Sequence, residues 1–423
     1  MLAPIQNQSP SDSGMGSELQ NIPPEAIRPV RPKSAEDPDP TSTTKDDRPL
    51  IKAGTDSAPA QVHTPPPPSP SMEELEKKYA PFVRHDVYGI MGRGELPRKE
   101  KLLLAIGLVV LLPLRVVAAT AILLVYYLIC RVCTAFLAPN REDEQEQEDY
   151  AHLGGWRRKV ITQSGRFCAR AMLFAFGFYW IRKTHVQGNN DINGKLNNEG
   201  QVSEPERPGA IVSNHVSHLD ILYHMSSSFP SFVAKRSVAK LPLVGLISKC
   251  LGCVYVQRES RSPEFKGVSG VVNERIKEAH QDELAPKIML FPEGTTTNGD
   301  FLLPFKTGAF LSKAPVLPVI LRYPYQRFSP AWESISGSRH VLLLLCQFIN
   351  YMEVIWLPVY CPSQQEKDDP KLYAENVRRL MAREGNMIMS DIGLAEKRVY
   401  HAALNESLLW LFFNSIYRVM VSW

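Results

Sequence analysis

Two apolar segments in the first half of the chain predict helices that associate with a membrane. Leu102–Cys130 is apolar apart from Pro113, Arg115 and Thr120, and basic residues flank it on both sides. It exceeds the roughly 20 residues that a helix needs to cross a bilayer, so we predict a membrane segment. It forms either one tilted helix, with Arg115 extending to an interface, or a hairpin that bends near Pro113. Phe167–Ile181 is aromatic-rich and too short to span, which predicts an interfacial helix or one packed on the folded domain.

From Pro208 onwards, short apolar runs alternate with helical periodicity. Continuous β-branched runs of this length predict strands that are covered on both faces, as in a mostly parallel sheet. Sites in such sheets gather at strand ends and in the loops that follow. We therefore predict an α/β domain over residues 208–401 with a mostly parallel central sheet. The predicted strands are Ala210–Ser213, Phe232–Ala234, Cys253–Val256, Lys287–Phe291, Val316–Leu321 and Val354–Val359, and the predicted helices are Leu243–Leu251, Val268–Glu283 and Leu372–Arg383.

The remaining regions differ from this domain in composition. Residues 1–71 are rich in Pro, Ser, Asp and Thr, which predicts a disordered arm because such a segment buries too little apolar surface to order itself. Ser71 and Glu74 resemble a capping box that opens a short helix. We expect a helical lead-in over 72–101, the membrane segment over 102–130, an interfacial helix and polar loop over 131–207, and an apolar tail of undefined role over 402–423.

Charge and metal-like patterns exclude several classes of protein. A formal net charge of +4 without a dense basic run argues against a nucleic-acid partner. Asn189–Gly200 has the spacing of a calcium loop, but its twelfth position is glycine where a bidentate carboxylate is required. The pairs Cys130-x-x-Cys133 and Cys250-x-x-Cys253 raise the alternative of a zinc protein, although the first pair ends the membrane segment. We therefore expect no bound metal.

The first predicted strand leads directly into a candidate general base. His215 follows the strand end, and Asp220 lies five residues later. This spacing allows the carboxylate to hold one imidazole nitrogen while the other faces a substrate, although a structural histidine gives the same pattern. No Gly-x-Ser-x-Gly sequence supplies a nucleophile for such a base, so direct activation of a substrate hydroxyl is the simplest mechanism.

Two further strand ends carry polar residues. Phe291–Gly299 reads FPEGTTTNG and brings a carboxylate, Glu293, together with three threonines and turn residues. Such a loop either presents amides and hydroxyls to a polar group or serves as a tight turn. Arg258 follows the strand Cys253–Val256, where its guanidinium suits a phosphate, although a surface ion pair is the ordinary alternative.

Taken together, these residues resemble the glycerolipid acyltransferase superfamily, which includes the glycerol-3-phosphate and lysophosphatidate acyltransferases. Four motifs occur in the order of that family. They are Asn214–Asp220, Gly252–Arg258, Phe291–Gly294 and Val316–Ile320. A closer similarity over residues 75–401, which includes the sequences GFYW at 177–180 and SFVAKR at 231–236, is to the plant lysophosphatidylethanolamine acyltransferases.

The resemblance implies an enzyme of the endoplasmic reticulum membrane that transfers an acyl group from acyl-coenzyme A to lysophosphatidylethanolamine, without a further cofactor. It implies that His215 is the base and Asp220 its orienting partner. It further implies that Arg258 contacts the phosphate, that Glu293, Gly294 and Thr295 line the acceptor site, and that Pro318 lines the acyl or acceptor cleft. Lysophosphatidate or lysophosphatidylcholine as acceptor, and a non-catalytic lipid-binding protein, remain the alternatives.

Overall fold

The computed structural model describes residues 72–142, 147–187, 206–256 and 268–405. Four sequence predictions fall outside these ranges: the arm over 1–71, the loop Asn189–Gly200, the position of Arg258, and the tail beyond residue 405. The boundaries proposed from composition therefore stay predictions.

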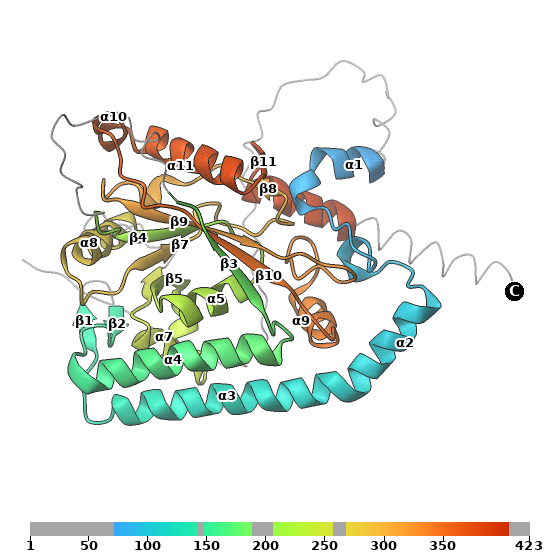
Figure 1. Cartoon of the computed structure of the whole chain (residues 1–423), viewed down its shortest axis with the longest axis horizontal. Helices are drawn as coiled ribbons and strands as arrows, with labels where there is room; N and C mark the ends of the chain where they lie inside the picture. Colours follow the sequence, from blue (N-terminus) through green and yellow to red (C-terminus); the bar gives the residue numbers. More distant parts are fainter. Residues whose placement is uncertain (1–71, 143–146, 188–205, 257–267, 406–423) are drawn as a thin grey trace, which may run out of the picture. The chain divides into compact units, whose positions relative to one another are not determined.

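A seven-stranded sheet forms the centre of the described chain (Figure 1), in the order β3-β10-β9-β4-β7-β5-β6. Strands β9, β4, β7, β5 and β6 run parallel to one another, whereas β10 is antiparallel to β9 and parallel to β3. The predicted mostly parallel sheet is confirmed. Its strands are β3 (Ile181–His185), β4 (Ala210–Ser213), β5 (Ser231–Lys235), β6 (Val254–Val256), β7 (Ile288–Leu290), β9 (Val316–Arg322) and β10 (Met352–Trp356).

The side chains of alternate residues in the central strands pack into two separate hydrophobic cores. Ile211 of β4 faces one core, and its neighbours Ala210 and Val212 face the other, because successive side chains of a strand point to opposite faces. Helices α4 (Gly155–Ala175), α5 (Leu219–Ser227) and α7 (Val244–Cys250) cover the first face, and α8 (Val268–Gln281) and α11 (Pro370–Glu384) cover the second (Figure 1). The domain is thus a helix, sheet and helix sandwich.

The smaller elements connect these layers. They are α6 (Arg236–Ala239), α9 (Gly337–Leu345), α10 (Gln364–Asp368), the 3-10 turns η1 (Ala80–Phe82), η2 (Ile90–Gly92) and η4 (Thr307–Ala309), and the strand pairs β1 (Asn140–Glu142) with β2 (Gln147–Asp149) and β8 (Phe301–Leu302) with β11 (Ile388–Met389).

One predicted helix has the wrong bounds. We expected a helix over Phe167–Ile181, but α4 runs from Gly155 to Ala175, and Ile181 begins strand β3. The helix stops because Gly177, with a φ of +89°, provides the left-handed residue that commonly follows a helix end. The first turns of α4 are too polar to show in an apolar scan, although Ile161 is buried against the core.

The predicted membrane segment is one continuous helical run of 36 residues, Arg98–Cys133. It comprises α2 (Arg98–Ile106), a π-helical turn η3 (Gly107–Leu111) and α3 (Leu112–Cys133). Pro113 lies in the first turn of α3, where its missing amide hydrogen is accommodated, so the chain bends without reversing into a hairpin. The run is long and apolar enough to cross a bilayer, and 6% of its most apolar window is buried. Among the described residues it is the one helix with these properties.

Arg115 does not extend towards an interface, contrary to one predicted geometry. Its guanidinium is buried and donates to the carbonyl of Leu345 (3.0 Å), the last residue of α9, and to those of Gln347 and Phe348 (3.1 Å), which follow the helix. The Leu345 carbonyl needs a donor because the last carbonyls of a helix have no partner within it. α3 also packs along α4 (Figure 1), where the absence of a side chain at Gly165 leaves room for the Tyr126 hydroxyl.

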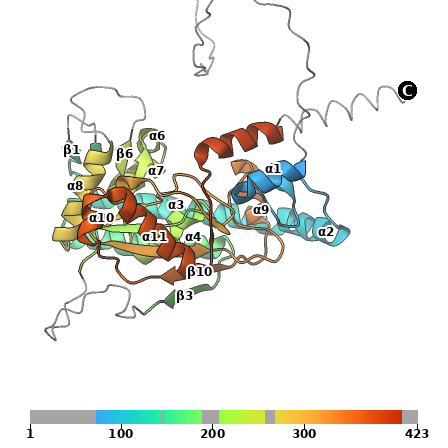
Figure 2. The same cartoon turned by 90° about the horizontal axis from the view of Figure 1, so that it is seen from above.

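The two ends of the described chain pack together beside the domain. Helix α1 (Met72–Lys78) begins where the capping pattern predicts a helix and leads to Tyr79, whose ring lies 5.3 Å from that of Tyr400. Tyr400 belongs to a helix over residues 394–405, which lies next to α1 (Figure 2). This contact brings Lys397 to the loop that follows β7.

Candidate active site

Strand β4 ends at a loop that is hydrogen-bonded to the neighbouring strand β9. Asn214 is buried, and its side-chain amide donates to the carbonyl of Leu321 (2.9 Å) and accepts from the Leu321 amide (2.8 Å). The side chain therefore continues the parallel pairing of β4 with β9 by one residue beyond Ser213. The next residue, His215, is thereby held at the carboxyl edge of the sheet.

His215 and Asp220 form a hydrogen-bonded pair. His215 Nδ1 lies 2.8 Å from Asp220 Oδ2, in the first turn of α5, and the Asp220 side chain is fully buried while that of His215 is 20% exposed. An ionised carboxylate can only accept, so the Nδ1 nitrogen carries the proton and Nε2 has a free lone pair. The amides of Val216 (2.8 Å) and Ser217 (3.0 Å) donate to the same carboxylate oxygen. This arrangement suits a general base.

Aromatic side chains fix the plane and surroundings of this pair. The ring of Phe291 stacks on the His215 imidazole with centroids 4.1 Å apart and an interplanar angle of 16°. The hydroxyl of Tyr323 donates to Asp220 Oδ1 at 2.5 Å. Tyr323, Asn214 and the Phe291 ring were not among the site residues predicted from the sequence. The available signal was that Tyr323 directly follows β9, whose carboxyl end meets that of β4.

Glu293 lies beneath the histidine and does not present a free carboxylate. It is 3% exposed; Oε1 accepts from the His215 amide (2.8 Å), and Oε2 accepts from the Leu303 amide (2.9 Å). Burial raises the pKa of Glu293 to about 8, although the two amide bonds act in the opposite direction. The Thr297 amide donates to the His215 carbonyl (3.0 Å). The loop after β7 therefore holds the main chain of His215 on both sides.

The other predicted site residues lie in different surroundings. Gly294 is exposed with a φ of +71°, and Thr295 beside it is half-buried. Pro318 is buried inside β9, opposite Val212 of β4, and so lies in the sheet layer and not in the loops beyond it. The structure thus brings together His215, Asp220 and Glu293, and the roles taken from the resemblance stay predictions.

Lys397 supports the loop after β7 from the C-terminal helix. Its ammonium group donates to the carbonyl (2.7 Å) and hydroxyl (2.9 Å) of Thr296 and to the carbonyl of Trp332 (3.4 Å). Burial lowers the pKa of Lys397 to about 8, and the negative charges of Glu333 and Glu293 oppose this shift. A residue far along the sequence therefore helps to position the loop that carries Glu293.

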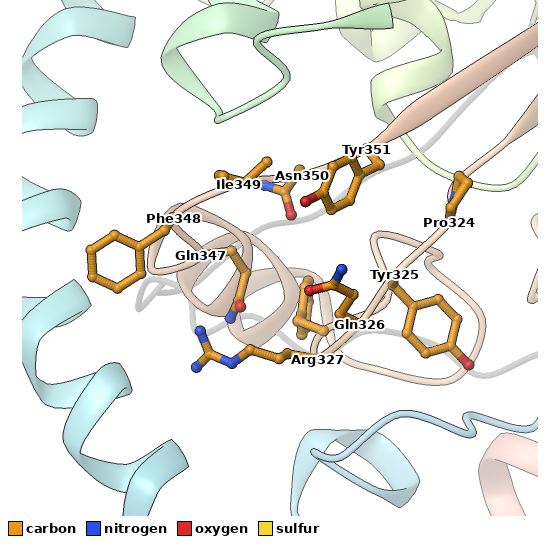
Figure 3. Close-up of a pocket in the computed structure, with 10 residues that line it drawn as sticks. Pro324, Tyr325, Gln326, Arg327, Gln347, Phe348, Ile349, Asn350 and Tyr351 are labelled. Carbon is orange, nitrogen blue, oxygen red and sulfur yellow. The ribbon is translucent and has the colours of Figure 1, made fainter. Parts of the chain in front are cut away.

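An open pocket of about 160 Å³ lies between residues 324–328 and residues 347–351 (Figure 3). It begins directly after Tyr323, with Tyr325 and Phe348 at opposite sides (Figure 3). None of the site residues predicted from the sequence lines it. Within the described residues, no group of three or more His, Cys, Asp or Glu side chains is arranged to hold a metal ion.

Comparison with known proteins decides the family. An acyltransferase family model matches residues 194–322, the segment that contains His215, Asp220 and Glu293. The chain is 61% identical over 383 residues to the lysophospholipid acyltransferase LPEAT1 of Arabidopsis thaliana, covering 86% of this chain and 94% of that protein. The chain belongs to the lysophospholipid acyltransferase family. The predicted resemblance and the predicted class of enzyme, an acyltransferase, are confirmed.

Other relatives of this acyltransferase are more distant. It is 31% identical to Arabidopsis LPEAT2, covering 74% of this chain, and 32% identical to lysophosphatidylcholine acyltransferase 1 of Danio rerio, covering 67%. The acyltransferase spans about half the length of these two proteins, 53% and 50%. The crystal structure of the lysophosphatidate acyltransferase PlsC from Thermotoga maritima aligns over 70% of this chain and all of that chain, with 18% identity and a TM-score of 0.42.

Proposed function

We propose that this enzyme transfers the acyl group of acyl-coenzyme A to the free glycerol hydroxyl of a lysophospholipid, with lysophosphatidylethanolamine as the preferred acceptor. The observation that supports this reaction is the His215–Asp220 pair with its unoccupied Nε2. No hydroxyl or thiol side chain of the described residues is bonded to that nitrogen. The base therefore acts on a hydroxyl that the substrate supplies, and no acyl-enzyme intermediate is formed.

In the proposed reaction, His215 Nε2 takes the proton of the acceptor hydroxyl while the hydroxyl oxygen attacks the thioester carbonyl. The resulting tetrahedral intermediate collapses, the carbon–sulfur bond breaks, and the imidazolium returns its proton to the coenzyme A thiolate. Asp220 stabilises the transient positive charge on the imidazolium. A positioned base of this kind contributes about 10² to 10⁴-fold to the rate.

The acceptor headgroup rests on similarity to LPEAT1 over most of both chains. Lysophosphatidylcholine is the second candidate, because more distant relatives carry that activity in their names. Lysophosphatidate is a further alternative. A non-catalytic lipid-binding role is disfavoured, since binding alone does not require a paired histidine and aspartate beside a buried glutamate. Arg258, whose position lies outside the described residues, is proposed to hold the acceptor phosphate.

We further propose that the enzyme works at the endoplasmic reticulum membrane. The exposed apolar residues of the helix Arg98–Cys133 support association with a bilayer, since they have no other cover among the described residues. An acceptor with one acyl chain stays in the membrane, so an enzyme fixed at the surface reaches it without extracting it completely.

The decisive experiment is an acyl-transfer assay on membranes that contain the expressed chain, with acyl-coenzyme A and a panel of lysophospholipids that differ only in headgroup. We expect the ethanolamine form to give the highest kcat/KM, and equal rates with every headgroup would contradict the proposed preference. His215→Ala should abolish transfer with every acceptor. His218→Ala is the matched control, because His218 packs against Trp332 and His340 and makes no hydrogen bond to Asp220.

A further inference from the structure

The buried carboxylate of Asp220 receives donors on both oxygens, from two different sources. Three donors converge on Oδ2, and all come from residues 215–217 of the same loop. Oδ1 accepts from the hydroxyl of Tyr323 at 2.5 Å, and no other described residue donates to this oxygen. The Oδ1 oxygen of Asp220 therefore depends for its hydrogen bond on a side chain 103 residues away in sequence.

The fold brings Tyr323 to this position. Tyr323 directly follows β9, which pairs in parallel with β4. The two hydrogen bonds between the Asn214 side chain and the main chain of Leu321 fix the register of the two strand ends. The ring is 8% exposed and packs edge-on against Phe178 with centroids 6.0 Å apart. Burial and the neighbouring Asp220 charge raise the pKa of Tyr323 well above its ordinary value, so the phenol remains a proton donor.

We propose that Tyr323 is a positioning residue that tunes the basicity of His215 through Asp220. This role rests on the proposed function of His215 as the base. A hydrogen bond to Oδ1 takes up part of the carboxylate charge, so less of it is left to stabilise an imidazolium at Nδ1. Together with the three donors on Oδ2, the same bond restrains rotation of the carboxylate about its Cβ–Cγ bond. This bond therefore helps to aim Nε2 of His215 in one direction. The other titratable groups beside the pair, Glu293, His218 and His224, are the same in a variant that lacks the bond.

Removing the hydroxyl has two consequences that a purely structural role does not produce together. In Tyr323→Phe the uncompensated carboxylate holds the imidazolium more strongly, so the acidic limb of the kcat/KM profile should move to higher pH by about one unit or less. kcat should fall by up to about ten-fold, because the carboxylate is less firmly held and Nε2 of His215 is aimed less accurately at the acceptor hydroxyl. KM values for both substrates should change little, because the Tyr323 side chain is 8% exposed and its hydroxyl is bonded to Asp220.

The titration of His215 can be followed without any acyl acceptor. Diethylpyrocarbonate acylates neutral imidazoles, and the His215 side chain is 20% exposed. The rate of modification of the peptide that contains His215, measured by mass spectrometry against pH, gives the midpoint of its titration. We expect this midpoint to be higher in Tyr323→Phe than in the parent enzyme, with His215→Ala identifying the signal.

Tyr373→Phe is the matched control. Tyr373 is also buried, and its hydroxyl donates to the carbonyl of Ala314 (3.0 Å) in the other core. Its replacement should lower the melting temperature without moving the His215 midpoint. An unchanged midpoint in Tyr323→Phe would overturn the proposal even if acyl transfer by the parent enzyme were established. A shifted midpoint in an enzyme inactive towards every lysophospholipid would retain the link between Tyr323 and His215 and reject the proposed substrate.

Discussion

Replacing Asn214 should destabilise the enzyme more than any exposed polar substitution. The Asn214→Ala change leaves the buried amide and carbonyl of Leu321 without their side-chain partners. A buried polar group that loses its partner costs about 1 to 3 kcal/mol, so the two groups together cost about 2 to 6 kcal/mol. At about 2 °C for each kcal/mol, the melting temperature should fall by at least about 4 °C.

Two further variants make this prediction specific. Asn214→Asp keeps an acceptor for the Leu321 amide but turns a carboxylate oxygen towards the Leu321 carbonyl, so it should be no better than alanine. Gln364→Ala removes only an exposed side-chain contact with Asp368 (3.4 Å) and should change stability by less than about 1 kcal/mol. Thermal unfolding of the purified enzyme in detergent measures all three. A normal melting temperature for Asn214→Asp would refute the hydrogen-bonding argument.

Three other predictions concern charged or titratable groups. Arg115→Leu should lower the melting temperature, because three carbonyls near the end of α9 lose their donor; an unchanged value would mean that the apolar helix is held by other contacts. Arg258→Lys should raise KM for the lysophospholipid and leave KM for acyl-coenzyme A unchanged, and Arg258→Ala should raise KM for the lysophospholipid further. A rise in KM for acyl-coenzyme A alone would assign Arg258 to the donor site. Burial lowers the pKa of His224 to about 4, so its neutral form stabilises the fold fully above pH 6.5 and this contribution is lost as pH falls towards 4. His224→Phe should reduce that loss by about 1 kcal/mol per pH unit, which unfolding at pH 7 and pH 5 measures.

The sequence predicted the elements whose side chains are buried, because burial leaves a visible pattern. Strand β4 is apolar at Ala210, Ile211 and Val212, and its predicted bounds agree with the structure. Strand β3 was missed for the opposite reason. Its sequence IRKTH is mostly exposed at the edge of the sheet, so the main-chain bonds to β10 form it without an apolar signal.

The candidate site was predictable only where its partners are close in sequence. His215 and Asp220 lie five residues apart, and their pairing follows from a strand end and one turn of helix. The contacts of Asn214 with Leu321 and of Tyr323 with Asp220 join residues 107 and 103 positions apart. They depend on the register of β4 with β9, which no local pattern specifies. The inward orientation of the Glu293 side chain could not be predicted from the sequence for the same reason, because its partner Leu303 belongs to a later loop.

The bond network of Arg115 has a practical consequence for anyone who wishes to produce the enzyme without detergent. Cutting away the apolar helix would leave polar atoms at the end of α9 without a donor and would uncover the side of α4 against which Tyr126 packs. A shortened chain of this kind should aggregate and not yield a water-soluble catalyst. Exchanging outward-facing residues such as Leu102, Val109 and Val117 for polar ones, with Arg115 retained, is the better route to solubility.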